Sequence, residues 1–133
     1  MSATSFLALD VDVESESELS TLILALDSWV FPVAVDFRDG VYRATLELRD
    51  GAPAPELAIG RFLSFIGSLP APALSSWLTA DRRVFNVGVQ AGSEHSTEFV
   101  FSPALLRLVA DSQAQLMLTI YGLRGAEVEL SGD

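Results

Sequence analysis

The residues of this chain with the clearest potential for chemistry are five acidic side chains near its start, Asp10, Asp12, Glu14, Glu16 and Glu18. They occupy alternate positions, and no basic residue lies among them. Carboxylates at this spacing can bind a cation or attract the basic groups of another protein. We call residues 10–18 the acidic segment.

The spacing Asp10-x-Asp12-x-Glu14 resembles the start of a calcium-binding loop, but the rest of that motif is absent. The loop requires glycine at its sixth position and a bidentate acid at its twelfth, where this chain has Ser15 and Thr21. We therefore predict no metal site. Weak cation binding stays open as an alternative, because alternation along a strand would place Asp10 and Asp12 on one face.

Other catalytic groups are sparse. The chain has no cysteine, which excludes disulfides, thiolate metal ligands and cysteine nucleophiles. Its single histidine, His95, lies in a glycine-containing hairpin turn and is expected to be a solvated residue rather than a general base. No nucleophile elbow surrounds Ser68, and no phosphate-binding glycine loop is present. We predict no catalytic residue, no cofactor and no hydrolytic or redox activity.

The composition favours a basic protein as the partner. The 133 residues include 18 acids against eight arginines, for a net charge of -10, which repels nucleic acid and anionic membranes. Half the residues are hydrophobic, which argues against disorder. There is no uninterrupted apolar span of about 18 residues and no basic signal-peptide start. We expect a cytoplasmic protein with a single α+β domain over residues 1–133.

The acidic segment joins a predicted strand to a predicted helix. Apolar residues alternate along residues 5–13, which is typical of a strand with one buried face, and then recur at helical spacing as far as residue 28. Ser15 would cap this helix, and Glu18 three residues later would complete a capping box. Glu16 and Glu18 would then lie in the first turn, where the helix dipole favours negative charge.

Periodicity and turn signals predict further strands and helices along the rest of the chain. Pro32 indicates an edge position for the second strand, and Ser102-Pro103 is a helix start signal. The elements are a hairpin over residues 29–48, a helix over 55–68, a short helical segment over 73–80, a second hairpin with strands at 85–90 and 97–101, a helix from 102, a strand over 116–121 and a short edge strand through Val128 and Leu130.

This order is β-α-β-β-α-(α)-β-β-α-β, and its first six elements match a ferredoxin-like β-α-β-β-α-β unit. We predict an α+β two-layer sandwich with a mainly antiparallel sheet of about six strands and three principal helices. The predicted core consists of Leu7, Leu9, Val11, Leu22, Leu26, Val35, Leu46, Phe62, Phe85, Val87, Phe101, Leu106 and Leu118.

A stripe of small residues, Gly60, Ser64 and Gly67, runs along the second predicted helix. Glycine inside a helix costs about 1 kcal/mol relative to alanine, so the stripe requires a reason. Either another element packs closely against it within the fold, or it is a self-association face of a homodimer.

In the second half, a strand beginning at Thr97 leads into Ser102-Pro103, a leucine-rich helix and a strand that ends in Ile120-Tyr121. This pattern, over roughly a third of the chain, resembles a family of small bacterial proteins known only as a domain of unknown function. The resemblance implies an α+β fold and an association with bacterial toxin–immunity modules. It implies no catalytic residues.

Two functions from different classes fit these observations. The first is an immunity or inhibitor protein that binds and neutralises a basic partner such as a toxin, because complementary charge gives fast and specific association. Its contact charges would be Asp10, Asp12, Glu14, Glu16, Glu127 and Glu129, with Asp133 beside them. The alternative is a small-molecule or cation-binding module that uses the sheet face around Asn86, Gln90 and Tyr42.

Overall fold

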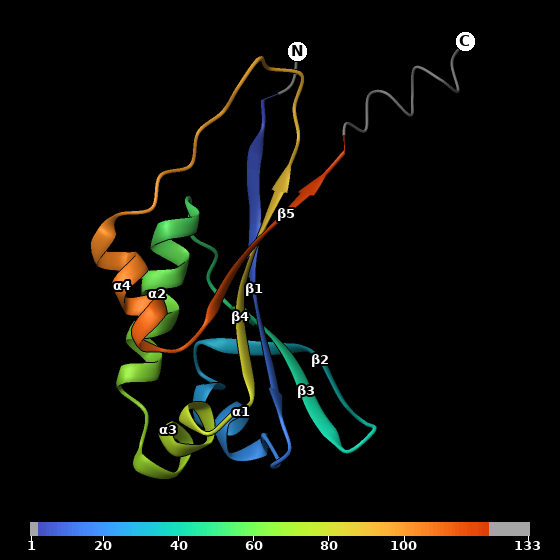
Figure 1. Ribbon diagram of the computed structural model, residues 1–133, viewed down its shortest axis with the longest axis vertical. Coiled ribbons are helices and arrows are strands. Elements are labelled where there is room, and N and C mark those ends of the chain that lie inside the picture. The colour runs from blue at the N-terminus through green and yellow to red at the C-terminus, as the bar shows by residue number, and fades with distance from the viewer. Residues whose placement is uncertain (1–2, 123–133) are drawn as a thin grey trace.

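The computed structural model describes residues 3–122, which form five strands and four helices (Figure 1). In chain order these are β1 (Ser5–Ser15), α1 (Ser20–Leu26), β2 (Val30–Arg38), β3 (Val41–Leu48), α2 (Pro55–Gly67), α3 (Ala71–Leu78), β4 (Arg82–Gln90), α4 (Pro103–Asp111) and β5 (Gln115–Tyr121). The fold is α+β, as the alternating and helical periodicities predicted. None of the helices in these described ranges is both long and apolar enough to cross a bilayer.

The five strands form one mixed sheet in the order β2-β3-β1-β4-β5. Strand β1 pairs antiparallel with β3 and β4, β2 pairs antiparallel with β3, and β4 pairs parallel with β5. Helix α1 connects β1 to β2 with β3 lying between them, which is a split β-α-β arrangement. The first six predicted elements therefore occur in the predicted order, with α3 added before β4.

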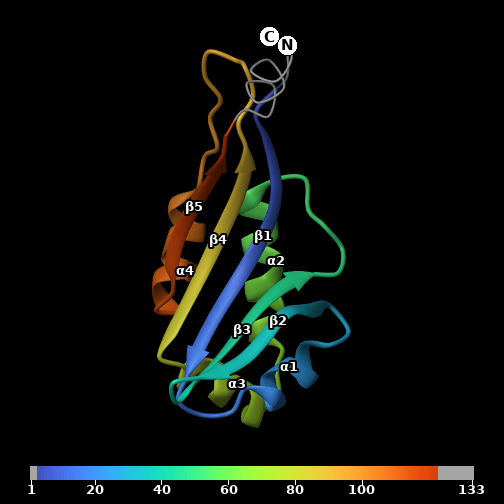
Figure 2. The ribbon, with the colours of Figure 1, turned by 90° about the vertical axis from the view of Figure 1, so that its right-hand side faces the viewer.

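All four helices cover one face of the sheet, and the other face has none (Figures 1 and 2). We call these the helix face and the open face. Leu9, Val11 and Val13 of β1 are buried on the helix face, so the residues between them point to the open face. The centre of the core is aromatic: the rings of Phe62 and Trp77 pack against Phe85 of β4 with centroid separations of 5.8 and 6.3 Å.

One charged side chain lies inside this core. Arg83 of β4 is only 4% exposed, and its guanidinium contacts the ends of two helices. It donates to the carbonyls of Trp77 at 2.7 Å and Ala80 at 2.8 Å, at the C-terminal end of α3, and to the carbonyl of Ser112 at 2.9 Å, at the end of α4. The negative end of each helix dipole therefore faces the cation. Burial lowers the pKa of Arg83, and the charge of Asp81 partly opposes that shift.

One predicted strand needs correction. Residues 97–101 form no strand, because β4 continues into a parallel crossover through α4 and not into a hairpin. The chain must return along the molecule before β5 can run parallel to β4, and Phe99 and Phe101 pack partly buried against the core on the way. The segment at 73–80 is a full helix, α3. The predicted strand through Val128 and Leu130 lies outside the described residues.

The predicted capping box is wrong. Ser15 pairs with Tyr42 as the last residue of β1, and its hydroxyl accepts a hydrogen bond from the Ser17 backbone N–H at 3.1 Å. Helix α1 begins only at Ser20, has no side-chain cap and has no acid in its first turn. The Glu18 carboxylate instead accepts a hydrogen bond from the hydroxyl of Ser20. The strand extends further than its apolar alternation indicated, because Ser15 is buried within the pairing.

Most of the predicted core is buried, and the exceptions have identifiable causes. Leu7 is exposed because an irregularity in the pairing between Phe6 and Ala8 turns it to the open face. The other exceptions lie where the helix layer does not reach or where α4 faces solvent: Val35, Leu106 and Leu118 are exposed and Phe101 is half-buried. A Cβ at Gly60 would lie 4.0 Å from Leu105 of α4, an ordinary van der Waals distance, and Ser64 and Gly67 are exposed, so close packing does not require the small residues of this stripe.

Replacement of Arg83 should destabilise the protein strongly. Arg83→Ala leaves the carbonyls at the ends of α3 and α4 without their donor, so we expect the free energy of unfolding to fall by about 3 kcal/mol. The free energy of unfolding of Arg83→Lys should lie between those of Arg83→Ala and the wild type, because an ammonium group cannot reproduce the forked donors of a guanidinium. Chemical denaturation measures both, with exposed Arg107→Ala as the control. If Arg83→Ala lost no more free energy of unfolding than Arg107→Ala, the contacts of Arg83 with the ends of α3 and α4 would not stabilise the core.

Candidate functional site

The acidic segment is divided by the fold. Asp10, Asp12 and Glu14 lie on β1 and point to the open face, while Glu16 and Glu18 lie in the exposed connection to α1. The backbone N–H of Glu16 donates to the Asp81 carboxylate at 2.8 Å, which fixes this connection to the start of β4. The predicted contact residues Glu127 and Glu129 lie outside the described residues.

Two of the three open-face acids already have partners. Glu14 lies between two arginines of the neighbouring strands, 3.2 Å from Nη1 of Arg82 and 4.0 Å from Nε of Arg43. Asp12 accepts a hydrogen bond from the hydroxyl of Thr45 at 2.8 Å. These two carboxylates therefore help to hold β3, β1 and β4 together, which reduces the negative charge that they offer to a partner.

Asp10 differs from its neighbours. Its Oδ1 atom is buried, and among residues 3–122 no amide, hydroxyl or backbone N–H donates to it, which leaves the carboxyl of Glu47 as its donor only while Glu47 is protonated. Directly across the sheet lie Glu47 of β3 and Asn86 of β4, and the Asn86 carbonyl is occupied by the hydroxyl of Thr119 at 2.7 Å. A buried acceptor without a donor is costly. Asp10 is thus a group whose energy would fall on contact with a cation or another donor.

The carboxyl group of Glu47, which lies opposite Asp10, has a shifted pKa. The pKa of Glu47 is raised above its ordinary value of 4.5, mainly by burial, then by a hydrogen bond with Asp10 and by the charge of Asp10. That hydrogen bond exists only while Glu47 holds its proton. When both groups ionise, two carboxylates face each other on adjacent strands, and a bound cation would relieve their repulsion.

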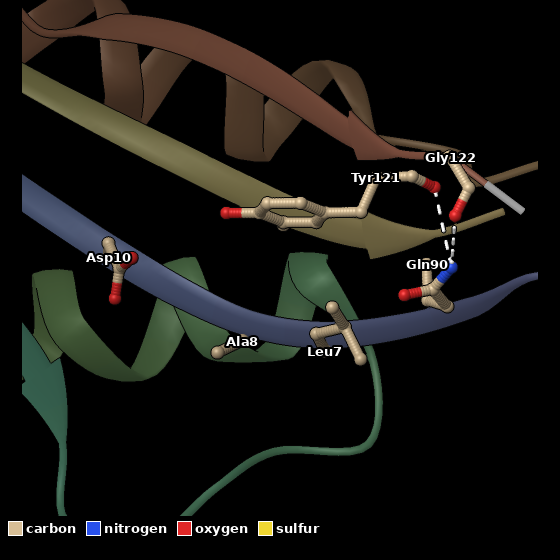
Figure 3. A pocket seen from close by; sticks show the side chains of 7 residues that line it. Leu7, Ala8, Asp10, Gln90, Tyr121 and Gly122 are labelled. Atoms are coloured by element: carbon tan, nitrogen blue, oxygen red, sulfur yellow. Dashed lines mark hydrogen bonds between the residues drawn. The ribbon is translucent and has the colours of Figure 1, made fainter. Parts of the chain in front are cut away.

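Beside Asp10 the open face is hollowed (Figure 3). The hollow has a volume of about 530 Å³ and is lined by Leu7, Ala8, Asp10, Gly88, Gln90, Tyr121 and Gly122. Figure 3 shows the Tyr121 side chain extending along the sheet toward the end where Asp10 lies, with Gln90 at the opposite end. We call this cavity the Asp10 hollow.

The shape of the Asp10 hollow depends on small residues and on the register of β5. A Cβ added at Gly88 would lie 3.4 Å from the carbonyl oxygen of Ala8 and 3.7 Å from the ring of Tyr121, so a larger side chain would fill the space. The Gln90 amide donates to the carbonyl of Gly122 at 2.7 Å and fixes the end of β5. A carboxylate at one end and an aromatic wall suit a guanidinium or ammonium group.

The sequence predicted part of this site. Asp10 was a predicted contact residue, and Asn86 and Gln90 do share a face with it. Tyr42 does not: its ring packs on Phe37 at a centroid distance of 4.4 Å, on the helix face of β3. Glu47, Gly88 and Tyr121 were missed as site residues. Alternation placed Glu47 on the polar face of its strand, but only the register between β1 and β3 places it opposite Asp10.

Comparison of the chain with protein-family models, with curated proteins and with solved structures found no match. Among the described residues, no three His, Cys, Asp or Glu side chains come together in a way that could hold a metal ion. His95 is exposed in the connection between β4 and α4 and does not line the Asp10 hollow.

The raised pKa of Glu47 predicts how stability depends on pH. Because the folded state holds this proton more tightly than the unfolded state, stability falls as the pH rises from 4.5 through the folded pKa of Glu47. Glu47→Gln removes this loss, and its amide can donate to Asp10 at any pH. We expect a higher melting temperature than wild type at pH 7 and a difference that shrinks below pH 4.5.

Thermal melts across this pH range check the prediction. Glu98→Gln is the matched control, since it makes the same chemical change at an exposed position. Parallel pH curves for wild type and Glu47→Gln would show that Glu47 and Asp10 are not coupled.

Proposed function

We propose that this chain is a bacterial, cytoplasmic interaction protein that binds and neutralises a basic protein partner such as a toxin, and that it does so through the open face of its sheet. The observation that carries the proposal is Asp10, which lies opposite a second carboxyl group, has no amide, hydroxyl or backbone N–H donor to its Oδ1 atom in the described part of the chain, and lines a hollow large enough for a side chain. The net charge of -10 supports it, because it favours encounter with a basic protein.

An arginine or lysine side chain of the partner fits the Asp10 hollow. Its cationic group would donate to Asp10, lie near Glu47 and pack against the ring of Tyr121, while Leu7 and Ala8 receive its aliphatic part. Contact between a desolvated cation and an aromatic ring adds to the charge interaction. An inserted side chain of this kind is a typical interface anchor.

The other acids of the predicted contact set take different roles in this proposal. Asp12 and Glu14 are held by Thr45 and by two arginines, so they contribute less to affinity than Asp10. Glu16 is exposed at the end of β1 and steers the partner during encounter. Glu127 and Glu129 remain proposed contact residues. The toxin-like character of the partner rests on the resemblance of the second half to a family of small bacterial proteins of unknown function, which implies an association with toxin–immunity modules.

A free cationic small molecule is the second candidate ligand. The hollow of about 530 Å³ lies within the range typical of small-molecule sites, and this volume is the observation that favours the alternative. The two candidate functions differ in how much of the protein surface the ligand contacts. A small ligand uses the hollow alone, whereas a protein also requires the charged surface around it, so its association rate depends on salt.

Replacement of Asp10 should weaken binding of the basic partner. The first partner to test is the product of any basic gene adjacent to the gene for this chain. We expect Asp10→Asn to raise the dissociation constant about tenfold or more, because it removes the charge that pairs with the inserted cation. Asp39→Asn is the matched control: it changes the net charge equally at an exposed turn with positive φ, which asparagine tolerates.

Stopped-flow association at two salt concentrations, with equilibrium titration, measures these effects. For wild type the association rate should fall as salt rises. Equal losses for Asp10→Asn and Asp39→Asn would mean that only net charge matters and would remove the hollow from the interface. The small-molecule function would be favoured if the chain bound free arginine with the same affinity at both salt concentrations and bound no basic protein.

A further inference from the structure

The outer edge of β5 is unprotected in the part of the chain that the structure describes. Strand β5 lies at the end of the sheet and pairs only with β4, so one row of its backbone N–H and C=O groups has no strand partner there. From Ser112 to Gly122 the sequence has no charged residue and no proline. An edge with these properties pairs readily with another strand.

The side chains of β5 are apolar on both faces of the sheet. Leu118 and Ile120 are 56% and 61% exposed on the helix face, because the helix layer ends before this edge. Met117 and Tyr121 are exposed on the open face. Most of the apolar surface of the strand therefore lacks a cover within the described residues.

The opposite edge of the sheet has the protection that β5 lacks. Strand β2 contains Pro32, which cannot donate a ladder hydrogen bond, and its pairing shifts register between Pro32 and Ala34. Asp36 and Arg38 form an ion pair at 3.2 Å near its end. Prolines, irregular pairing and charges are the devices that keep an edge from associating. The contrast within one sheet indicates that β5 is an interaction surface.

We propose that two copies of this chain associate through β5, paired antiparallel about a twofold axis perpendicular to the sheet. The absence of charge on β5 permits a second copy as the partner at this strand. Two chains of net charge -10 repel each other over most of their surfaces, and β5 is a strip where they can meet without opposing like charges. A basic partner has no carboxylate to bind on β5.

The sequence of β5 is self-complementary when two copies pair about Leu118. With the axis at Leu118, this residue lies opposite its own copy, and Leu116 lies opposite Ile120 of the other copy. All of these side chains belong to the helix face, so the pairing forms one continuous apolar row. On the open face Met117 meets Thr119. The register therefore keeps apolar side chains together and buries no charge.

Single introduced cysteines test this register directly, because the chain has no cysteine of its own. Residues directly opposite in an antiparallel pair have Cα atoms about 4.5 to 5.5 Å apart, which permits a disulfide. Leu118→Cys should therefore form a covalent dimer with oxidised glutathione. Leu116→Cys, on the same strand and face, should not, because its two copies would lie four residues or about 13 Å apart.

Sedimentation velocity on the full chain provides the second measurement. Wild type should show a monomer–dimer equilibrium over micromolar concentrations, and Leu118→Lys should shift it toward monomer at least tenfold. Val35→Lys on β2 is the matched control, since Val35 is also 56% exposed. Circular dichroism checks folding. A wild-type chain that stays monomeric, equal effects of the two lysines, or equal cross-linking of the two cysteine variants would overturn the proposal. A folding failure of Leu118→Lys leaves the cysteine comparison as the deciding test.

Discussion

The buried guanidinium of Arg83 is the interaction on which the arrangement of the sheet depends. A cation in the core must be surrounded by acceptors, and the acceptors here are backbone carbonyls at the C-terminal ends of α3 and α4. The requirement fixes both helix ends against the start of β4. Strand β5 begins at Gln115, three residues after Ser112, so its position beside β4 follows from the same contact. A neutral side chain at position 83 would remove this constraint.

The position of β5 in turn shapes the open face. Parallel pairing with β4 sets Tyr121 beside Gln90 and leaves Gly88 in front of its ring, which creates the hollow next to Asp10. The pKa of Glu47 is raised first by burial and then by its hydrogen bond with Asp10 and by the charge of Asp10, so ionising Glu47 at this position is unfavourable. A purely structural sheet face would gain by replacing one of these two carboxyls with an amide. Their juxtaposition is what the proposed binding of a cation would relieve.

The local sequence pattern predicted the features that depend on neighbouring residues alone, which are strands, the faces of their residues and helix caps. Alternation identified β1, β3 and β4 and the faces of their residues, and Ser102 caps α4 as expected, accepting from the Leu105 N–H at 3.2 Å. The capping-box prediction at Ser15 was wrong because a serine followed three residues later by a glutamate, here Glu18, can also stand at the end of a strand. Alternation also assigns a side chain to a face without showing how far the helix layer reaches, so Leu118 was predicted to be buried. The Asp10–Glu47 pair depends on register between strands 37 residues apart, which no short window contains.

The two proposed surfaces are compatible because the sheet separates them. A twofold axis perpendicular to the sheet keeps the helices of both copies on one side, so both open faces point the same way. Each Asp10 hollow opens on that face, whereas the pairing uses the backbone edge of β5. The dimer would then present two cation-binding hollows on one continuous surface. A partner with two suitably spaced basic side chains would engage both, and its affinity would exceed that for one hollow by the effective concentration of the second. Leu118→Lys would lower that gain without altering the contacts within either hollow.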